Sequence, residues 1–240
     1  MSPKTPARTP KPVRAALPKT GAKPGAKDAT RRRTRGRPPA DAPDLRARLL
    51  DAALACYVRQ GIAATSLRDI ANEAGVTPAM LHYYFGDKVQ LQRAVTEARV
   101  LPALDPLQAR LQATGGEVGD LVLAFVAGIG EVVAAHPWLP SLWVREVLSD
   151  GGALRETLFD SIGPRVPVML AGRFADAQVR GALNPDLDPR LLMVSLVGLT
   201  LFPAAGAPIW RRLFDAGDLD YAALQRHVLA LLGRGLELDR

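Results

Sequence analysis

The stretch "TSLRDIANEAGVTPAMLHYYFGDK", residues 65–88, has the pattern of two short helices joined by a tight turn. Thr65 or Ser66 can cap the first helix, because a hydroxyl oxygen there accepts from an amide of the first turn. Gly75 ends that helix, since glycine adopts the positive φ of a tight turn without strain. This spacing predicts a helix-turn-helix.

The second helix of the pair begins at Pro78, a first helical position at which the missing amide proton costs nothing. Thr77 is placed to cap it. Ala71 is small where two crossing helices touch, and Leu81 fills the core between them. These details favour a DNA-binding helix-turn-helix, although a purely structural helical hairpin remains open from this segment alone.

The second helix has one buried and one outward face. At about 100° per residue, Leu81 and Phe85 point into the core, whereas Ala79 and Tyr83 point away from it. The flanks hold Met80, His82 and Tyr84. A helix fits the major groove, where hydroxyl and imidazole groups reach phosphates and base edges and apolar groups contact thymine methyls. The aromatic cluster therefore favours a DNA-facing surface, with a structural role as the alternative for His82.

A longer helix precedes this pair. Leu45, Leu49, Ala52 and Cys56 are spaced by four, three and four residues, which predicts a helix with one buried stripe. Gly61 closes it at a C-cap position.

Composition narrows the class of protein. A chain of 240 residues with 48% apolar content can bury a sizeable core without disulfides. Cys56 is the only cysteine, and the histidines at 82, 136 and 227 lack ligand-pair spacing, so we expect no metal and no cofactor. A secretory signal has an apolar segment directly after its basic N-terminal residues, and this N-terminus has none. A cytoplasmic protein is expected.

Charge is concentrated in the first 40 residues, which hold 12 Lys and Arg against one acidic residue, Asp28. The rest of the chain has a balance of −4, although the whole chain is +7. With many prolines and few large apolar residues, residues 1–43 are expected to form a disordered arm that attracts polyanions.

Residues 44–91 resemble the DNA-binding domain of the tetracycline-repressor (TetR) family of bacterial regulators. The resemblance rests on the Ala-Ala first helix ending in Gly61, the "TSLRDIA" entry, the "AGV" turn, the aromatic second helix and Lys88. It implies an all-α homodimer, with a small reading head and a larger ligand-binding and dimerisation domain at residues 92–240. It also implies DNA contacts from Ser66, Arg68, Thr77, Pro78, Met80, His82, Tyr83, Tyr84 and Lys88.

The basic stretch "TRRRTRGRPPA", residues 30–40, resembles an AT-hook. Arg35 and Arg37 would insert into a narrow A·T minor groove, where the negative potential is strongest. A solvated basic linker is the alternative.

Residues 92–240 are predicted to be helical throughout, interrupted at Pro102, at the glycine and proline pairs, and at "NPDLDP", residues 184–189. A connector helix from Asp87 to about Leu101 would join the two domains and act as the lever between them. An apolar ligand pocket could be lined by Phe125, Ile129, Trp143, Val147, Phe159, Met169 and Phe174, although ordinary core packing explains the same residues.

The segment "LLMVSLVGLTLFPAAGAPIW", residues 191–210, contains no charge and is long enough to cross a bilayer. Its glycines and prolines disfavour a membrane span, and a helix buried in a dimer has the same composition. With the last helix it would form a four-helix dimer interface. The predicted interface residues are Leu191, Val194, Leu196, Leu224, Val228 and Leu231.

No serine elbow, phosphate loop or Cys-His pair is present, so an enzyme is not expected. The sequence favours a ligand-responsive repressor that binds palindromic DNA as a homodimer and is released by a small apolar or amphipathic effector. A constitutive architectural DNA-binding protein that uses its basic tail is the alternative.

Overall fold

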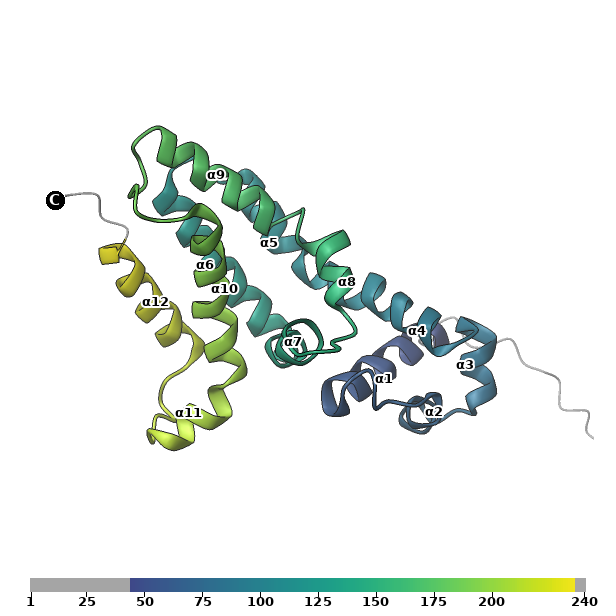
Figure 1. The fold of residues 1–240 in the computed structure, drawn as a ribbon. Helices are drawn as coiled ribbons and strands as arrows, with labels where there is room; N and C mark the ends of the chain where they lie inside the picture. Colours follow the sequence, from purple (N-terminus) through teal and green to yellow (C-terminus); the bar gives the residue numbers. More distant parts are fainter. Residues whose placement is uncertain (1–43, 236–240) are drawn as a thin grey trace, which may run out of the picture. The chain divides into compact units, whose positions relative to one another are not determined.

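The computed structural model describes residues 44–235, which form helices joined by turns and contain no strand (Figure 1). The all-α prediction is confirmed. The α-helices are α1 (Leu45–Gln60), α2 (Leu67–Ala74), α3 (Pro78–Phe85), α4 (Lys88–Val95), α5 (Leu101–Ala113), α6 (Val118–Ala135), α7 (Leu139–Trp143), α8 (Arg155–Thr157), α9 (Pro167–Val179), α10 (Pro189–Ala205), α11 (Ala207–Leu213) and α12 (Tyr221–Gly235). Segments of π-helix are η1 (Thr96–Val100), η2 (Val144–Leu148) and η3 (Leu158–Ile162).

The head, which we define as α1 to α4, packs around a core that also takes in Leu142, Val147 and Leu154 from later in the chain, and we call it the head core. Leu49, Ala52 and Cys56 of α1 are buried, as the spacing predicts, while Leu45 is half-buried at the start of the stripe. Gly61 follows α1 with a φ of 88°, a backbone conformation that favours glycine. The head core buries α1 against α2 and α4.

The connector is longer than the sequence predicts. The helical path runs from α4 through η1 into α5 and ends at Ala113, so the predicted boundary at residue 91 falls inside α4. Pro102 does not break this path. Its ring leaves the Ala98 carbonyl without the usual helical partner, and the Arg99 guanidinium donates to that oxygen at 3.0 Å. The π-helical segment η1 immediately before Pro102 widens the backbone at this point.

The body, which we define as α5 to α12, packs around α6. Helix α6 contacts α5, α9, α10 and α12, and α9 also packs along α10 (Figure 1). The predicted interruption at the Gly115–Gly116 pair falls between helices, and the one at residues 184–189 ends where Pro189 begins α10. Pro167 begins α9 at its first helical position.

Two parts of the body are apolar enough to cross a membrane by length and composition. One is α6, of which 56% is buried in the described structure, and the other is the α10–α11 pair, which bends by 70°. The core helix of a water-soluble protein passes the same test, and α6 lies in the body core. The bend at Gly206 interrupts the 191–210 segment that could have been a straight span.

Candidate functional site

The turn between α2 and α3 is built by local hydrogen bonds. Gly75 has a φ of 67° in the left-handed region, and its N–H lies 3.2 Å from the Asn72 carbonyl. The Val76 N–H donates to the Ala71 carbonyl at 2.9 Å, which closes the C-terminal end of α2. Ala71 is fully buried, as expected for a residue at a helix crossing. The helix-turn-helix is therefore fixed by its own sequence.

Ser66, rather than Thr65, caps α2. The Ser66 hydroxyl accepts from the Asp69 N–H at 3.2 Å, and the Asp69 carboxylate accepts from the Ser66 N–H at 2.9 Å, which makes a reciprocal capping box. The Thr65 hydroxyl is buried and donates to the Gly61 carbonyl at 2.6 Å. Thr77 precedes α3 but its hydroxyl makes no capping bond, which corrects the prediction that it caps that helix.

The variant Ser66→Ala should lower the free energy of unfolding by about 1 kcal/mol, because an amide of the first turn loses its acceptor. Thr77→Ala is the matched control and should cost less, since Thr77 caps nothing. Urea unfolding followed by circular dichroism measures both changes. An equal loss from the two substitutions would contradict the capping role of Ser66.

The same cap makes head stability depend on pH. The Ser66 hydroxyl and N–H hold the pKa of the Asp69 carboxyl below its ordinary value. A carboxyl with a lowered folded-state pKa stabilises the fold above the unfolded pKa, roughly 3.9, and loses this effect as the pH falls through its folded value. The destabilisation by Ser66→Ala should therefore shrink in acid.

The outward face of α3 carries the aromatic cluster. Tyr83 is 81% exposed, whereas Leu81 and Phe85 are buried at 1% and 7% exposure, so the predicted inward and outward faces of α3 are confirmed. The ring of Tyr84, which is half-buried, meets Tyr83 edge to face with the ring centroids 5.3 Å apart. The cluster therefore presents one exposed phenol supported by a second ring.

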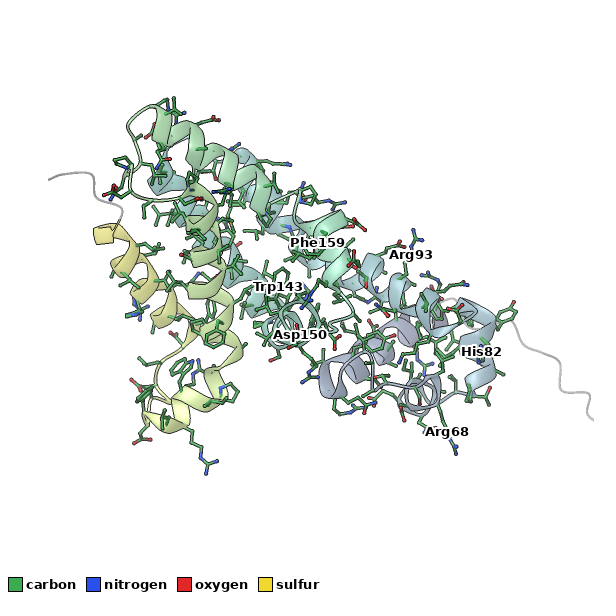
Figure 2. All side chains as sticks on the ribbon, viewed as in Figure 1. Arg68, His82, Arg93, Trp143, Asp150 and Phe159 are labelled. Atoms are coloured by element: carbon green, nitrogen blue, oxygen red, sulfur yellow. The ribbon has the colours of Figure 1, made fainter. Side chains whose placement is uncertain are left out.

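His82 is both held in place and exposed. Its Nδ1 lies 2.6 Å from the Gly86 carbonyl oxygen. Because a carbonyl only accepts, Nδ1 carries the proton, and in the neutral ring Nε2 is then an acceptor. Nδ1 of His82 therefore has the structural role that the sequence left open, because it bonds to the end of α3. The ring remains at the surface of α3 (Figure 2).

The other predicted DNA-contact residues surround this face to different degrees. Ser66, Arg68, Thr77 and Pro78 are exposed, and Figure 2 shows the Arg68 side chain pointing away from the helices. Met80 is half-buried. Lys88 is also half-buried, and its Nζ donates to the Ala63 carbonyl at 2.9 Å, so it ties α4 to the α1–α2 loop. Arg35 and Arg37 lie outside the described residues.

Arg46 also lies beside α3, although the sequence pattern gave no sign of it. Its guanidinium lies 5.4 Å from the centre of the Phe85 ring, and the residue is exposed. Cation–π contact places a positive charge at the C-terminal end of α3. Arg46 and Phe85 are far apart in sequence, so only the tertiary structure shows this neighbourhood.

An apolar cavity of about 60 Å³ lies in the body. Its walls come from α5, α6, α7, α9 and α10 and from the residues before α9. Apolar lining residues include Leu104, Phe125, Ile129, Leu139, Trp143, Ile162, Met193, Val197 and Leu201, and polar ones are Asp105, Gln108, Ser161 and Arg165. A smaller void of about 10 Å³ adjoins it and is lined by Trp143 and Val147.

The predicted pocket residues divide into two groups. Phe125, Ile129 and Trp143 line the cavity, and Val147 lines the adjoining void. The remaining predictions are corrected here: Phe159 is 60% exposed, Phe174 is fully buried in the body core, and Met169 packs against that core without lining the cavity. Core, surface and cavity draw on the same apolar residue types, so spacing alone does not separate them.

Residues 49–95 match the sequence model of the family described as bacterial regulatory proteins, tetR family. The head of this chain therefore carries a DNA-binding domain of the TetR family type. This agrees with the expectation that the chain is not an enzyme, because the relatives it matches are transcriptional regulators.

Two curated relatives give the scale of the sequence match. The chain is 38% identical over 63 residues to the HTH-type transcriptional regulator SrpR of Pseudomonas putida, covering 26% of this chain and 30% of that protein. It is 39% identical over 71 residues to the HTH-type transcriptional regulator BetI of Rhizobium meliloti, covering 30% and 35%. The match thus spans about a third of these relatives.

Solved structures match over most of the chain. The fatty acid degradation regulator FadR of Bacillus halodurans aligns with a TM-score of 0.60 at 19% identity, over 80% of this chain and 95% of its own. The ketosteroid regulator KstR2 of Mycobacterium tuberculosis aligns with a TM-score of 0.63 at 20% identity, over 82% and 97%. At these identities the likeness concerns the fold.

The body leaves an apolar surface uncovered on α10 and α12. On α10, Leu191, Val194 and Phe202 are 63%, 64% and 66% exposed, and Leu231 of α12 is 53% exposed. We call these four residues the α10–α12 patch. Three further interface predictions change: Leu196 and Val228 are buried in the body core of the same subunit, and Leu224 is half-buried against it. The reason is that α10 has two apolar faces, of which the body covers one.

Among residues 44–235, no group of three or more His, Cys, Asp or Glu side chains is arranged to hold a metal ion.

Proposed function

We propose that this protein is a ligand-responsive transcriptional repressor. It binds palindromic operator DNA as a homodimer and is released by a small apolar or amphipathic effector. Residues 44–91 read DNA, and residues 92–240 bind the effector and dimerise. The observation that carries the proposal is the exposed aromatic face of α3, held by a capped helix-turn-helix of the TetR family type.

DNA recognition in this proposal uses two kinds of contact. Tyr83 and the Nε2 of His82, an exposed residue, reach base edges or phosphates from α3 in the major groove, and Met80 offers apolar contact. Ser66, Arg68, Thr77, Pro78, Tyr84 and Lys88 anchor the flanks, and Arg46 adds a phosphate contact. A dimer holds two α3 helices about 34–36 Å apart, so that they enter successive grooves.

The α10–α12 patch is the proposed dimer surface. Leu191, Val194 and Phe202 follow helical spacing on one side of α10, and an exposed apolar stripe of this kind is typical of an interface. Pairing α10 and α12 of two subunits buries the stripe in a four-helix arrangement.

The cavity suggests the chemistry of the effector. Most of its lining residues are apolar, and the two charged ones, Asp105 and Arg165, lie 4.0 Å apart. The Trp143 indole N–H is buried without a hydrogen-bond partner in the described structure, so an oxygen on the effector would satisfy it. FadR of Bacillus subtilis, which has a similar fold, was solved with stearoyl-CoA. An apolar body with a polar group fits both observations.

Release follows from differential binding. The cavity is about 60 Å³, whereas small-molecule sites are typically roughly 300–1,000 Å³, so an effector fits only after the walls move apart. A ligand that binds this opened state shifts the population away from the DNA-competent state, by no more than its difference in affinity.

Selection of bound sequences from random DNA, followed by footprinting, tests the proposal. We expect a palindrome whose two half-sites are each protected by one head of a dimer. Amphipathic compounds such as acyl-CoA esters are then titrated against the complex. Random sequence after selection, or binding as a monomer without a palindrome, would argue for the architectural alternative.

The basic arm gives a separate prediction. Deleting residues 1–40 should weaken operator binding and reduce its salt dependence by ~0.9 log unit per lost phosphate contact, because fewer counterions are released. Replacing Arg35 and Arg37 with alanine should remove only the preference for A·T-rich flanks. Fluorescence anisotropy across a salt series measures both. Equal affinity and equal salt slope for full-length and truncated protein would reduce the arm to a tether.

A further inference from the structure

The body contacts the head at a second place besides the α4–α5 connector. Glu146 lies on η2 and is only 4% exposed. One carboxylate oxygen accepts from the Ile62 N–H at 3.0 Å, and the other accepts from the Ala153 N–H at 3.3 Å. Glu146 therefore joins the α1–α2 loop of the head to the loop before α8 of the body.

The neighbourhood is shaped for this contact. The Arg145 guanidinium donates to the Val58 carbonyl at 3.0 Å, so consecutive side chains of η2 hold the end of α1. Gly61 packs directly against both of them: a Cβ there would lie 3.1 Å from the Arg145 side chain and 3.1 Å from the Glu146 carboxylate. A buried carboxylate is costly unless it is hydrogen-bonded, and here backbone amides supply the bonds.

Hydrogen bonds continue from Glu146 to the start of α2. The Ile62 carbonyl accepts from the Thr65 N–H at 3.3 Å, and the Thr65 hydroxyl donates to Gly61. Thr65 is followed directly by Ser66, which caps α2. Glu146 is thus connected, through the hydrogen bonds of Ile62 and Thr65, to the residue that caps α2.

The cavity reaches the same element. Trp143 lines the cavity and packs against both the body core and the head core. Val147 lines the adjoining void and belongs to the head core. Glu146 lies between these two residues in sequence. The π-helical bond from the Ser149 N–H to the Val144 carbonyl, at 3.0 Å, marks an irregular turn of the kind often found at functional sites.

We propose that Glu146 is a positioning residue that couples the cavity to the reading head. An occupant that enlarges the cavity displaces Trp143, η2 moves with it, and the carboxylate leaves the Ile62 N–H. The α1–α2 loop is then released and α2 loses its fixed start. This inference rests on the proposed function, because it takes the cavity as the effector site and α3 as the DNA-reading element.

Glu146→Gln is the informative variant, because it keeps the shape of the side chain. An amide has only one oxygen, so it can accept from Ile62 or from Ala153 but not from both, and its NH2 group faces the remaining donor. Glu156→Gln is the matched control, since Glu156 is an exposed carboxylate on the neighbouring α8.

A cavity-filling substitution stands in for the unidentified effector. Val197 is half-buried on α10 and lines the cavity, so Val197→Phe adds volume there. Val197→Leu adds a smaller volume. It replaces Val197→Phe in the experiment if circular dichroism shows that the phenylalanine variant does not fold. Operator affinity is measured for full-length protein carrying Val197→Phe alone, Glu146→Gln alone, both together, and Val197→Phe with Glu156→Gln.

In the parent and in the Glu156→Gln background, Val197→Phe should weaken operator binding about tenfold, within the usual range of coupling between sites. In the Glu146→Gln background, Val197→Phe should weaken operator binding less than about twofold, because the carboxylate bridge between Ile62 and Ala153 is already broken. Equal fold-changes in all backgrounds, or no effect of Val197→Phe on operator binding, would overturn the coupling role.

Hydrogen exchange separates failure of this inference from failure of the proposed function, because it needs no operator. Val197→Phe should speed exchange of the Ile62 amide by about tenfold or more, as expected when a protecting bond opens locally. Unchanged Ile62 exchange overturns the coupling role even where DNA binding changes. Faster Ile62 exchange in a protein that selects no operator supports the coupling and rejects the repressor function.

Discussion

The variant Val194→Asp should be a folded monomer that no longer holds its operator. Val194 is 64% exposed in the single subunit, so a carboxylate there stays hydrated and leaves the subunit core intact. In the proposed dimer the same carboxylate is buried without a partner, which costs about 3–5 kcal/mol. That cost weakens dimerisation at least ~100-fold. Light scattering reports the mass, and anisotropy reports operator binding.

Val168→Asp is the matched control, because Val168 of α9 is equally exposed, at 65%, and lies outside the α10–α12 patch. It should remain a dimer with unchanged operator affinity. A Val194→Asp protein that stays dimeric at micromolar concentration would remove α10 from the interface. A Val194→Asp monomer that binds the operator as tightly as the parent would show that one head suffices.

The second large effect is expected at Tyr83. Tyr83→Ala should cost about 1–3 kcal/mol of operator binding, because the side chain supplies contact area and a hydroxyl at the centre of the proposed reading face. Stability should change little, since Tyr83 is 81% exposed and meets the half-buried Tyr84 ring in an edge-to-face contact. Gel shifts against the selected operator and a single-base variant measure affinity and discrimination.

Tyr83→Phe separates the hydroxyl from the ring, and its affinity should fall between those of the parent and the alanine variant. Phe159→Ala removes an aromatic side chain of 60% exposure far along the chain and should leave DNA binding unchanged. Unaltered operator affinity in a folded Tyr83→Ala protein would mean that DNA is read by another face.

The helix-turn-helix followed from the sequence because its signals are local. Caps, turn glycines and a proline at a first helical position act within about one turn, so Ser66, Gly75 and Pro78 set the bounds of α2 and α3. The helical period then sent Leu81 and Phe85 inward and Tyr83 outward. The family resemblance added the expected DNA contacts, which remain predictions.

The body was predictable as helices but not as surfaces. An apolar side chain can fill the core, line a cavity or lie on a surface that contacts a second subunit, and its spacing along a helix is the same in each case. Phe174 and Leu196 proved to be core residues, while Phe159 proved to be exposed. Only the packing of α10 against α6 and α9 shows which face of α10 stays uncovered.

Long-range polar contacts were decided by the tertiary structure alone. Glu146 reads in the sequence as one more surface carboxylate, yet it is buried against the Ile62 amide, 84 residues away. Pro102 reads as a helix end, yet η1 and the Arg99 guanidinium let the helical path continue. The sequence by itself determined where α2 and α3 begin and end and which family the head resembles. Which side chains meet across the fold depended on packing, because the energy of such a contact depends on atoms that local sequence does not bring together.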